Sequence, residues 1–357
     1  MQIDGHHTLT YIAARLAGFN RLKAAKIAYC AQYVDDATNS GVIHFKNGAM
    51  YNRISSAHKM LDYRNTDALA NHLAWIPFHF LPGNGGQPAG ENPDGTFIKK
   101  LVCRPDSHVA RDMLRACVND QNKPYGLHRL GVTMHVYADT FAHQGFAGVN
   151  HKINEVSDLA SNNKSLDKSF FNKITNFFLS ESFPLGHGAA LSHPDRPSLA
   201  WQYTNGLGES VDRNNTDIFM DATDKMCRAM QCFQAKDREM NLDDMDGIGT
   251  ADAAKIRSLL KTIKGESGEE RHEKWLNEIK NGAFSFGAEE VVYIAKGENS
   301  WKHKAIGQQA ATDTGREEFA YKKTFLKSDW KNFHDGLQAH RFDILHDILP
   351  KYGISAA

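Results

Sequence analysis

The stretch GLHRLGVTMHVYADTFAHQGFAGVNH, residues 126–151, decides how the rest of the chain is interpreted. It has the composition of a helix, yet between Leu130 and His151 it contains no Lys, Arg or Glu. In that span it carries three histidines and a single acid, Asp139. A helix face that is open to water is normally filled with charged residues. The stretch therefore predicts a helix with a buried polar face.

Helical spacing places the titratable groups of this stretch on one stripe. His135, Asp139 and His143 follow one another at intervals of four residues, and His128 lies seven residues before His135. Burying Asp139 as an anion is costly unless a cation compensates it. Core histidines that only bond to backbone carbonyls are the alternative interpretation. The stacking of three titratable groups favours a metal, and imidazole and carboxylate without thiolate suit Zn²⁺.

One helix cannot complete a coordination sphere, so other elements should supply further ligands. His6 lies on the apolar stripe of the predicted helix 6–18, and Asp35 continues the buried stripe of the next helix. Asp4 is either a helix cap or a ligand. The remaining candidates are His58, His79, His187, His193 and Asp195. A core role for His79 and turn roles for His193 and Asp195 are equally consistent with their neighbours.

The hydrophobic pattern predicts a mainly α fold, a multi-helix bundle around the His/Asp metal cluster with a minor β-hairpin. The hairpin covers GVIHFKNGAMYNRI, residues 41–54, with Asn47-Gly48 as its turn. Further helices are expected near residues 56–75, 105–120, 125–145, 165–180, 215–240, 251–263, 316–326 and 335–348. Residues 1–240 are expected to form the metal-dependent core, and residues 241–357 a helical extension packed on the same domain.

Composition restricts the cellular setting and the partners. Lys plus Arg equals Asp plus Glu, so no broad basic field for nucleic acid is expected. Five cysteines without CxxC spacing indicate neither a disulfide framework nor a thiolate zinc site. The start of the chain does not read as a secretory leader, and no apolar run is long enough for a transmembrane segment. We expect synthesis in the cytoplasm, with any secretion by a leaderless route.

The pattern resembles the superfamily of zinc-dependent phospholipases C and single-strand-specific zinc nucleases. GHHTLTYIAA at residues 5–14, YVDD at 33–36 and LGVTMHVYAD at 130–139 carry the resemblance, which covers residues 4–195. It implies two or three zinc ions per chain, held by His6, Asp35, His58, His135, Asp139, His143, His187 and Asp195. The additional candidates are Asp4, His79, His128 and His193. VDD with WIPFHFLPG, residues 75–83, is also similar to a branch of bacterial proteins of unknown activity.

Three departures from the superfamily concern the ends of the ligand set. No Trp supplies a terminal amine ligand ahead of His6, and Asp4 is the expected substitute. The step from Asp139 to His143 is short. Leu191 stands where an acid should follow His187. The third metal position is therefore the one that the resemblance defines least.

The resemblance implies an enzyme that hydrolyses phosphodiester bonds with metal-activated water, with Asp139 and His135 in catalytic roles. A phospholipid is the favoured substrate, with aromatic residues such as Trp201 and Tyr203 as a headgroup wall. Single-stranded nucleic acid is the alternative substrate. A non-catalytic, metal-stabilised helical binding protein is the alternative to an enzyme. A delivered bacterial toxin would bring an immunity protein as partner. The dipeptides His334-Asp335 and His346-Asp347 suggest an HD-type phosphohydrolase as a further hypothesis, although their charged neighbours fit solvent-exposed surface residues better.

Overall fold

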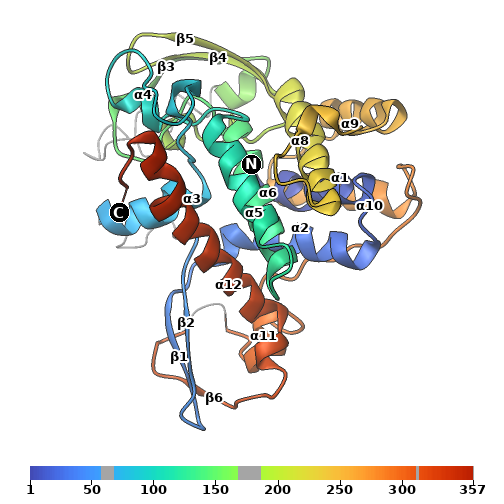
Figure 1. Cartoon of the computed structure of the whole chain (residues 1–357). Coiled ribbons are helices and arrows are strands. Elements are labelled where there is room, and N and C mark those ends of the chain that lie inside the picture. Colours follow the sequence, from blue (N-terminus) through green and yellow to red (C-terminus); the bar gives the residue numbers. More distant parts are fainter. Residues whose placement is uncertain (58–67, 168–185, 311–312, 357) are drawn as a thin grey trace.

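The computed structural model describes residues 1–57, 68–167, 186–310 and 313–356. The predicted ligand His58 and most of the expected helix 165–180 lie outside these residues. In the described residues the fold is mainly helical, with two small three-stranded sheets (Figure 1). The helical prediction is confirmed in this coarse form. The expectation of a single minor hairpin is wrong, because a second sheet and a third strand on the hairpin are present.

The chain begins with a π-helical turn that continues directly into the first α-helix. A second π-helical turn follows the last long helix. The turns are η1 (Asp4–Leu9) and η8 (Asp343–Ile348). The helices are α1 (Thr10–Leu16), α2 (Arg21–Asp36), α3 (Ala68–Phe78), α4 (Ile98–Leu101), α5 (His108–Asn119), α6 (Gly126–Ala142), α8 (Asn215–Ala235), α9 (Thr250–Thr262), α10 (Gly268–Lys280), α11 (Trp301–Ile306) and α12 (Asp329–Phe342).

Helices α2 and α6 form the centre of the fold and run in the same direction. Their contact is close because Gly131 has no side chain: a Cβ there would lie 2.4 Å from the Ile27 carbonyl oxygen and 2.4 Å from Cys30 Cβ. One turn further on, the carbonyl oxygen of Ala31 lies 2.7 Å from His135 Nδ1. The parallel pairing therefore brings the carboxyl ends of both helices, with their polar residues, to the same place.

The predicted hairpin is present and has gained a third strand. Strands β1 (Gly41–Phe45) and β2 (Met50–Arg53) are antiparallel, with Gly48 in the turn at a φ of 83°. Strand β6 (Glu318–Phe319) pairs in parallel with β1. The expectation of a helix over 316–326 is therefore wrong, because pairing with a distant strand outweighs the local helical pattern there.

The second sheet was not predicted. It has the order β3-β4-β5, from β3 (Val156–Ser161), β4 (Ala200–Asn205) and β5 (Ser210–Asn214), with antiparallel neighbours. Trp201 and Tyr203 on β4 are buried in a cluster with Phe80 and Phe146. They belong to the core of this sheet rather than to an exposed aromatic wall.

The residues beyond 240 are built into the same core as the first half of the chain. Trp275 of α10 and Ile344 of η8 lie in one buried cluster with Leu9 and Met134. Helix α12 packs on α6, and α10 packs on η1 (Figure 1). Among the described residues, no helix combines the length and the apolar character that crossing a bilayer requires.

Candidate metal centre

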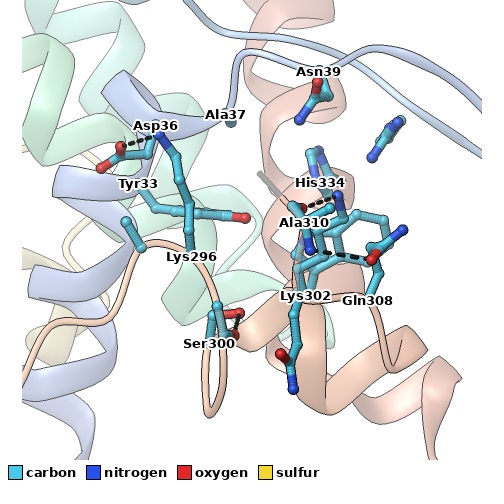
Figure 2. Close-up of a pocket in the computed structure, with 15 residues that line it drawn as sticks. Tyr33, Asp36, Ala37, Asn39, Lys296, Ser300, Lys302, Gln308, Ala310 and His334 are labelled. Atoms are coloured by element: carbon cyan, nitrogen blue, oxygen red, sulfur yellow. Dashed lines mark hydrogen bonds and ion pairs between the residues drawn. The ribbon is translucent and has the colours of Figure 1, made fainter. Parts of the chain in front are cut away.

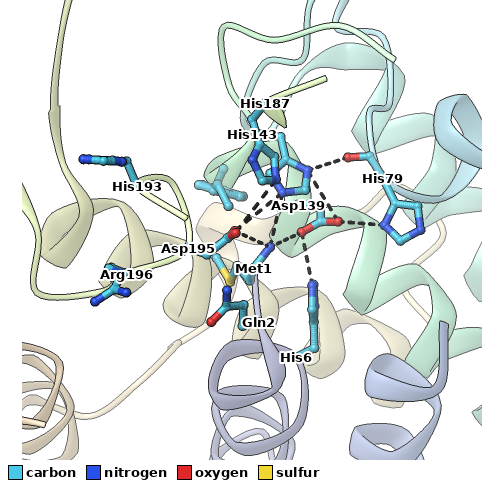
Figure 3. A network of polar contacts seen from close by, with 12 residues as sticks. Met1, Gln2, His6, His79, Asp139, His143, His187, His193, Asp195 and Arg196 are labelled. Carbon is cyan, nitrogen blue, oxygen red and sulfur yellow. Dashed lines mark hydrogen bonds and ion pairs between the residues drawn. The ribbon is translucent and has the colours of Figure 1, made fainter. Parts of the chain in front are cut away.

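Polar residues from segments far apart in the sequence meet at the carboxyl ends of α2 and α6, and Figure 3 shows those that lie around Asp139 and Asp195. The cluster contains three groups of three residues, and within each group the ligand atoms lie within 4.8 Å of one another. The groups are His6, Asp35 and His135; His79, His135 and Asp139; and His143, His187 and Asp195. These include every ligand predicted from the sequence except His58, which lies outside the described residues, together with the additional candidate His79. The cluster can hold a metal ion.

Asp139 lies at the centre of the cluster and is almost completely buried. Its Oδ1 atom is 3.2 Å from His6 Nε2, and its Oδ2 atom is 3.4 Å from His79 Nδ1 and 3.3 Å from His135 Nε2. His143 Nδ1 is 3.6 Å from the same Oδ2 atom. One carboxylate thus faces four imidazoles: two from α6 and its C-cap, one from η1 and one from the stretch after α3.

His135 and His79 are each oriented by a hydrogen bond to a backbone carbonyl oxygen, and each points its other ring nitrogen at Asp139. His135 Nδ1 donates to the carbonyl oxygen of Ala31, and His79 Nε2 donates to that of Ser56 at 2.9 Å. The other two nitrogens, His135 Nε2 and His79 Nδ1, lie 3.2 Å apart. Both also face a carboxylate oxygen. Two ring nitrogens and a carboxylate oxygen thus converge on one point, which is an arrangement that a cation can occupy.

His143 and His187 repeat the arrangement. His143 Nδ1 donates to the carbonyl oxygen of His79 at 2.8 Å, and His187 Nδ1 donates to that of Leu191 at 3.1 Å. Their Nε2 atoms lie 3.8 Å and 3.9 Å from the two carboxylate oxygens of Asp195. Metal-binding histidines usually donate their second N–H to a carbonyl or carboxylate, which fixes the ring for coordination. These rings are fixed in that way.

Buried atoms of the cluster that lack a hydrogen bond support the fit to a metal. Among the described residues, both ring nitrogens of His6, Oδ2 of Asp139 and Oδ1 of Asp195 have no hydrogen-bond partner. Leaving a buried polar atom unpaired costs about 1–3 kcal/mol. Because His6, Asp139 and Asp195 each belong to one of the three His/Asp groups and offer good nitrogen and oxygen ligands, the residues present fit a bound metal cation.

The α-amine of Met1 also lies in the cluster, which was not predicted. It is 2.6 Å from Asp139 Oδ1, 3.4 Å from Asp195 Oδ1 and 3.3 Å from His143 Nε2. Burial lowers the pKa of this amine, but the two carboxylates outweigh burial and raise it to about 10. The ammonium therefore compensates part of the buried negative charge. No local pattern reveals it, because the chain start is brought in only by the docking of η1.

Burial and neighbouring charges shift the pKa values of His6, His143 and Asp139. Burial lowers the pKa of His6 to about 3, with the neighbouring His135 adding to the shift. It lowers the pKa of His143 to about 4 against the attraction of Asp139. Burial alone would raise the pKa of Asp139, but His143, the Met1 ammonium and the other histidines hold it well below its usual value. Neutral imidazoles and ionised carboxylates are the forms that bind metal.

Arg213 of β5 holds the end of α6 that carries the cluster. Its guanidinium donates to the carbonyl oxygens of Phe141, Ala142 and Gln144, at 3.3, 2.7 and 3.0 Å. These carbonyls belong to the last turn of the helix or lie just beyond it, where no intrahelical donor remains. The side chain thereby fixes the point at which His143 leaves the helix.

Replacing Arg213 by methionine is expected to lower the free energy of unfolding by about 2–3 kcal/mol, because buried carbonyl oxygens lose their donor. Urea denaturation followed by circular dichroism measures the change. Arg257→Met is the control, since Arg257 is 45% exposed and pairs with Asp217 on the surface. That control should cost less than about 1 kcal/mol. If both variants lost the same free energy of unfolding, the hydrogen bonds of Arg213 to the end of α6 would contribute no more than a surface ion pair does.

Three of the additional candidates lie away from the cluster. Asp4 accepts from Arg271, with Nε at 2.6 Å, so it neither caps a helix nor reaches the other ligands. His128 pairs with Asp329 at 2.8 Å, at the opposite end of α6 from Asp139. His193 Nδ1 donates to the carbonyl oxygen of Ala190 at 2.9 Å. His128 therefore lies on the same helical stripe as His135 and Asp139 but outside the cluster, because α6 extends beyond the cluster.

The cluster opens into a cavity of about 340 Å³. Trp75 and Phe80 form its aromatic wall, and the half-buried carboxylate of Asp35 lies at its edge. No lysine or arginine is among the described residues that line this cavity. The aromatic stretch WIPFHFLPG thus contributes to the cavity through Trp75 and Phe80, and to the cluster through His79.

The HD dipeptides lie outside this centre. His334 is buried rather than solvated, and lines a separate small cavity with Lys302 and Gln308 (Figure 2). Asp335 accepts from Tyr51 at 2.9 Å. His346 is exposed. Neither dipeptide belongs to the three His/Asp groups, so the structure gives the HD-type interpretation no support.

The fold and the site define a mainly helical protein with buried His/Asp groups that can hold a metal ion. The chain belongs to the family of unknown function DUF6765, whose family model matches residues 1–348. The match includes most of the chain beyond residue 240 as well as all of the cluster. No curated protein and no solved structure matches the chain.

Proposed function

We propose that the protein is a zinc-dependent phosphodiester hydrolase with an activity like that of phospholipase C. The observation that carries the proposal is the convergence of three His/Asp groups on one buried site that opens into a cavity. A closed structural zinc site needs four ligands. The three groups share only His135, so they offer more ligands than one such site uses. This excess favours catalysis over a purely structural role.

The chain's own residues divide the work of the centre. Asp139 and His135 lie where the groups meet and would hold and orient what is bound between them. His143, His187 and Asp195 would hold the third position, and Trp75 and Phe80 exclude water from one side of the cavity. Bound zinc would supply a water of lowered pKa and polarise the phosphoryl oxygens. The α-amine of Met1 lies among these side chains, as a terminal amine does in the family that the sequence resembles.

The cavity lining favours a phospholipid over a nucleic acid. An aromatic ring beside a carboxylate attracts a quaternary or primary ammonium headgroup, and Trp75 and Asp35 both line the cavity. A nuclease site would combine stacking rings with a basic path for the backbone. The rings are present, but the described lining residues include no lysine or arginine. Single-stranded nucleic acid is therefore the second candidate substrate.

Removing the metal is expected to abolish phosphodiesterase activity and to lower the melting temperature. The purified protein should carry two or three zinc ions per chain, one for each His/Asp group that is occupied. Chelation exposes the buried carboxylates and lone pairs to mutual repulsion, and zinc should restore both properties. Inductively coupled plasma mass spectrometry measures the metal. A protein that stays metal-free after zinc addition would refute the proposal.

Three substrates then separate the enzymatic interpretations. Short-chain phosphatidylcholine tests the lipid reaction, single-stranded DNA tests the nuclease, and bis(p-nitrophenyl) phosphate reports phosphodiester hydrolysis without either recognition element. We expect phosphatidylcholine to be cleaved with the highest kcat/KM. Cleavage of DNA alone would select the second candidate. Full zinc occupancy with no cleavage of any substrate would leave a structural metal site.

A further inference from the structure

One guanidinium from the second half of the chain holds the N-terminal segment in place. Arg271 of α10 donates from Nε to Asp4 Oδ2 at 2.6 Å and from Nη2 to Asp4 Oδ1 at 3.2 Å. Its Nη2 atom also donates to Gln2 Oε1 at 2.8 Å. Gln2 follows Met1, and Asp4 precedes His6 by two residues. Both partners therefore belong to the short segment that carries Met1 and His6 into the cluster.

The same side chain reaches a second segment that carries a ligand. Nη2 of Arg271 lies 3.4 Å from the backbone carbonyl oxygen of Asp195, the carboxylate of the third His/Asp group. Nη1 donates to the carbonyl oxygens of Gly265 and Ser267, at 3.3 and 3.0 Å, which fix the guanidinium to the start of its own helix. The rigid fork of an arginine makes such a multiple contact possible, whereas a lysine offers only a point charge.

The contact is buried and closely packed. The side chains of Arg271 and Asp4 are 3% and 0% exposed. Beside them, His272 Nε2 lies 2.9 Å from His7 Nδ1. A Cβ on Gly268 would lie 2.8 Å from Gln2 Oε1 and 2.9 Å from Gln2 Cβ, so the first turn of α10 lies directly against the start of the chain. Solvent screens an ion pair in this setting only weakly.

We propose that Arg271 is a positioning residue of the metal centre. By binding Gln2, Asp4 and the Asp195 carbonyl together, it sets the separation between the N-terminal segment and the loop that carries Asp195. His6 and Asp195 belong to different His/Asp groups, so one residue of α10 aligns ligands of two groups. This gives part of the chain beyond residue 240 a direct role in the site. The inference rests on the proposed function only in requiring that the centre binds metal.

The test compares two conservative substitutions at buried arginine–aspartate pairs in the full-length protein. Arg271→Lys keeps a cation for Asp4 but removes the fork. Arg53→Lys makes the same change at the pair of Arg53 with Asp313, whose side chains are 6% and 3% exposed. Neither residue is a member of the three His/Asp groups. Asp4→Asn is the second variant at the proposed contact, because it preserves shape and removes only the charge.

Three measurements are made on each protein. Competition with a chromophoric chelator gives the affinity for Zn²⁺. The visible absorption of the Co²⁺-substituted protein reports the ligand geometry. The rise in melting temperature on adding zinc shows how much metal binding stabilises each variant, separately from its stability without metal. Loss of a neighbour that orients a ligand typically lowers metal affinity by about 10–100-fold. We expect a loss of this size, with an altered Co²⁺ spectrum, in Arg271→Lys and Asp4→Asn but not in Arg53→Lys.

A purely structural role for Arg271 predicts a different result. Arg271→Lys would then melt at a lower temperature with and without zinc, while its zinc affinity, its zinc-induced rise in melting temperature and its Co²⁺ spectrum matched those of Arg53→Lys. That outcome in both Arg271→Lys and Asp4→Asn would overturn the inference. A wild-type protein that binds no zinc would instead overturn the proposed function, so the two failures are distinguishable.

Discussion

Asp139→Asn is expected to remove metal binding and phosphodiesterase activity together. Asparagine keeps the shape of the side chain but replaces one carboxylate oxygen by an NH₂ group, which cannot act as a ligand. Since Asp139 faces His6, His79, His135 and His143, the change affects every ring around it. Disturbing a residue that only orients a ligand already costs about 10–100-fold, so loss of this carboxylate should exceed 100-fold in zinc affinity and in kcat/KM.

Zinc content and hydrolysis of bis(p-nitrophenyl) phosphate measure the two effects in the same preparation. Asp252→Asn is the matched control. Asp252 is a buried carboxylate of α9 that accepts from the Ser285 hydroxyl at 2.6 Å and belongs to none of the three groups. The Asp252→Asn protein should be less stable than the wild type but should bind the same amount of zinc. If Asp139→Asn retained the zinc content of the wild type, the cluster would not be the metal site and the proposed function would fail.

Gly131→Ala is expected to destabilise the fold and to weaken metal binding at the same time. The added Cβ would lie 2.4 Å from the Ile27 carbonyl oxygen and 2.4 Å from Cys30 Cβ, and the backbone atom cannot rotate away. Alanine gains about 1 kcal/mol of helix propensity over glycine. Overpacking costs about 1–3 kcal/mol and more when backbone must move, so we expect a net loss of about 2 kcal/mol or more.

The metal effect follows from the geometry of the two helices. Separating α2 from α6 moves Asp35 away from His135, whose Nε2 lies 3.9 Å from Asp35 Oδ1. Urea denaturation and zinc affinity are the measurements. Gly249→Ala is the control, because Gly249 has a φ of −61° and a Cβ there meets nothing within 4 Å. Because Gly249 is the N-cap of α9, where alanine is less favourable than glycine, this control should lower the free energy of unfolding by about 1 kcal/mol or less. A Gly131→Ala protein as stable as this control would contradict the close contact.

Periodic patterns identified the helices that carry the cluster and the face on which its residues lie. The stripe with His135, Asp139 and His143 could be predicted because helical periodicity is a local property, and the absence of Lys, Arg and Glu indicated burial. Asp35 could be predicted in the same way from the stripe of its own helix. The hairpin with the Asn47-Gly48 turn also follows from local chemistry.

Other features depend on segments that are distant in the chain. Strand β6 and the second sheet depend on pairing with strands that are distant in the sequence, and their own local sequence does not predict these strands. Asp4 binds Arg271, a residue 267 positions away, so no local pattern could separate a cap from a ligand or an ion pair. The position of His128 outside the cluster could not be predicted, because a helical stripe specifies a direction around the helix but not which end of the helix meets the cluster.

The sequence by itself determined which residue types could form a metal site and on which helix faces they would lie, since amphipathic spacing and composition are written locally. Only the tertiary structure decided which of them meet. The packing of α2 against α6 at Gly131, the docking of η1 by Arg271 and the end of α6 at Arg213 assemble the centre. They also bring the Met1 amine into it. Each depends on a contact between distant segments, which hydrophobic burial and buried hydrogen bonds select together.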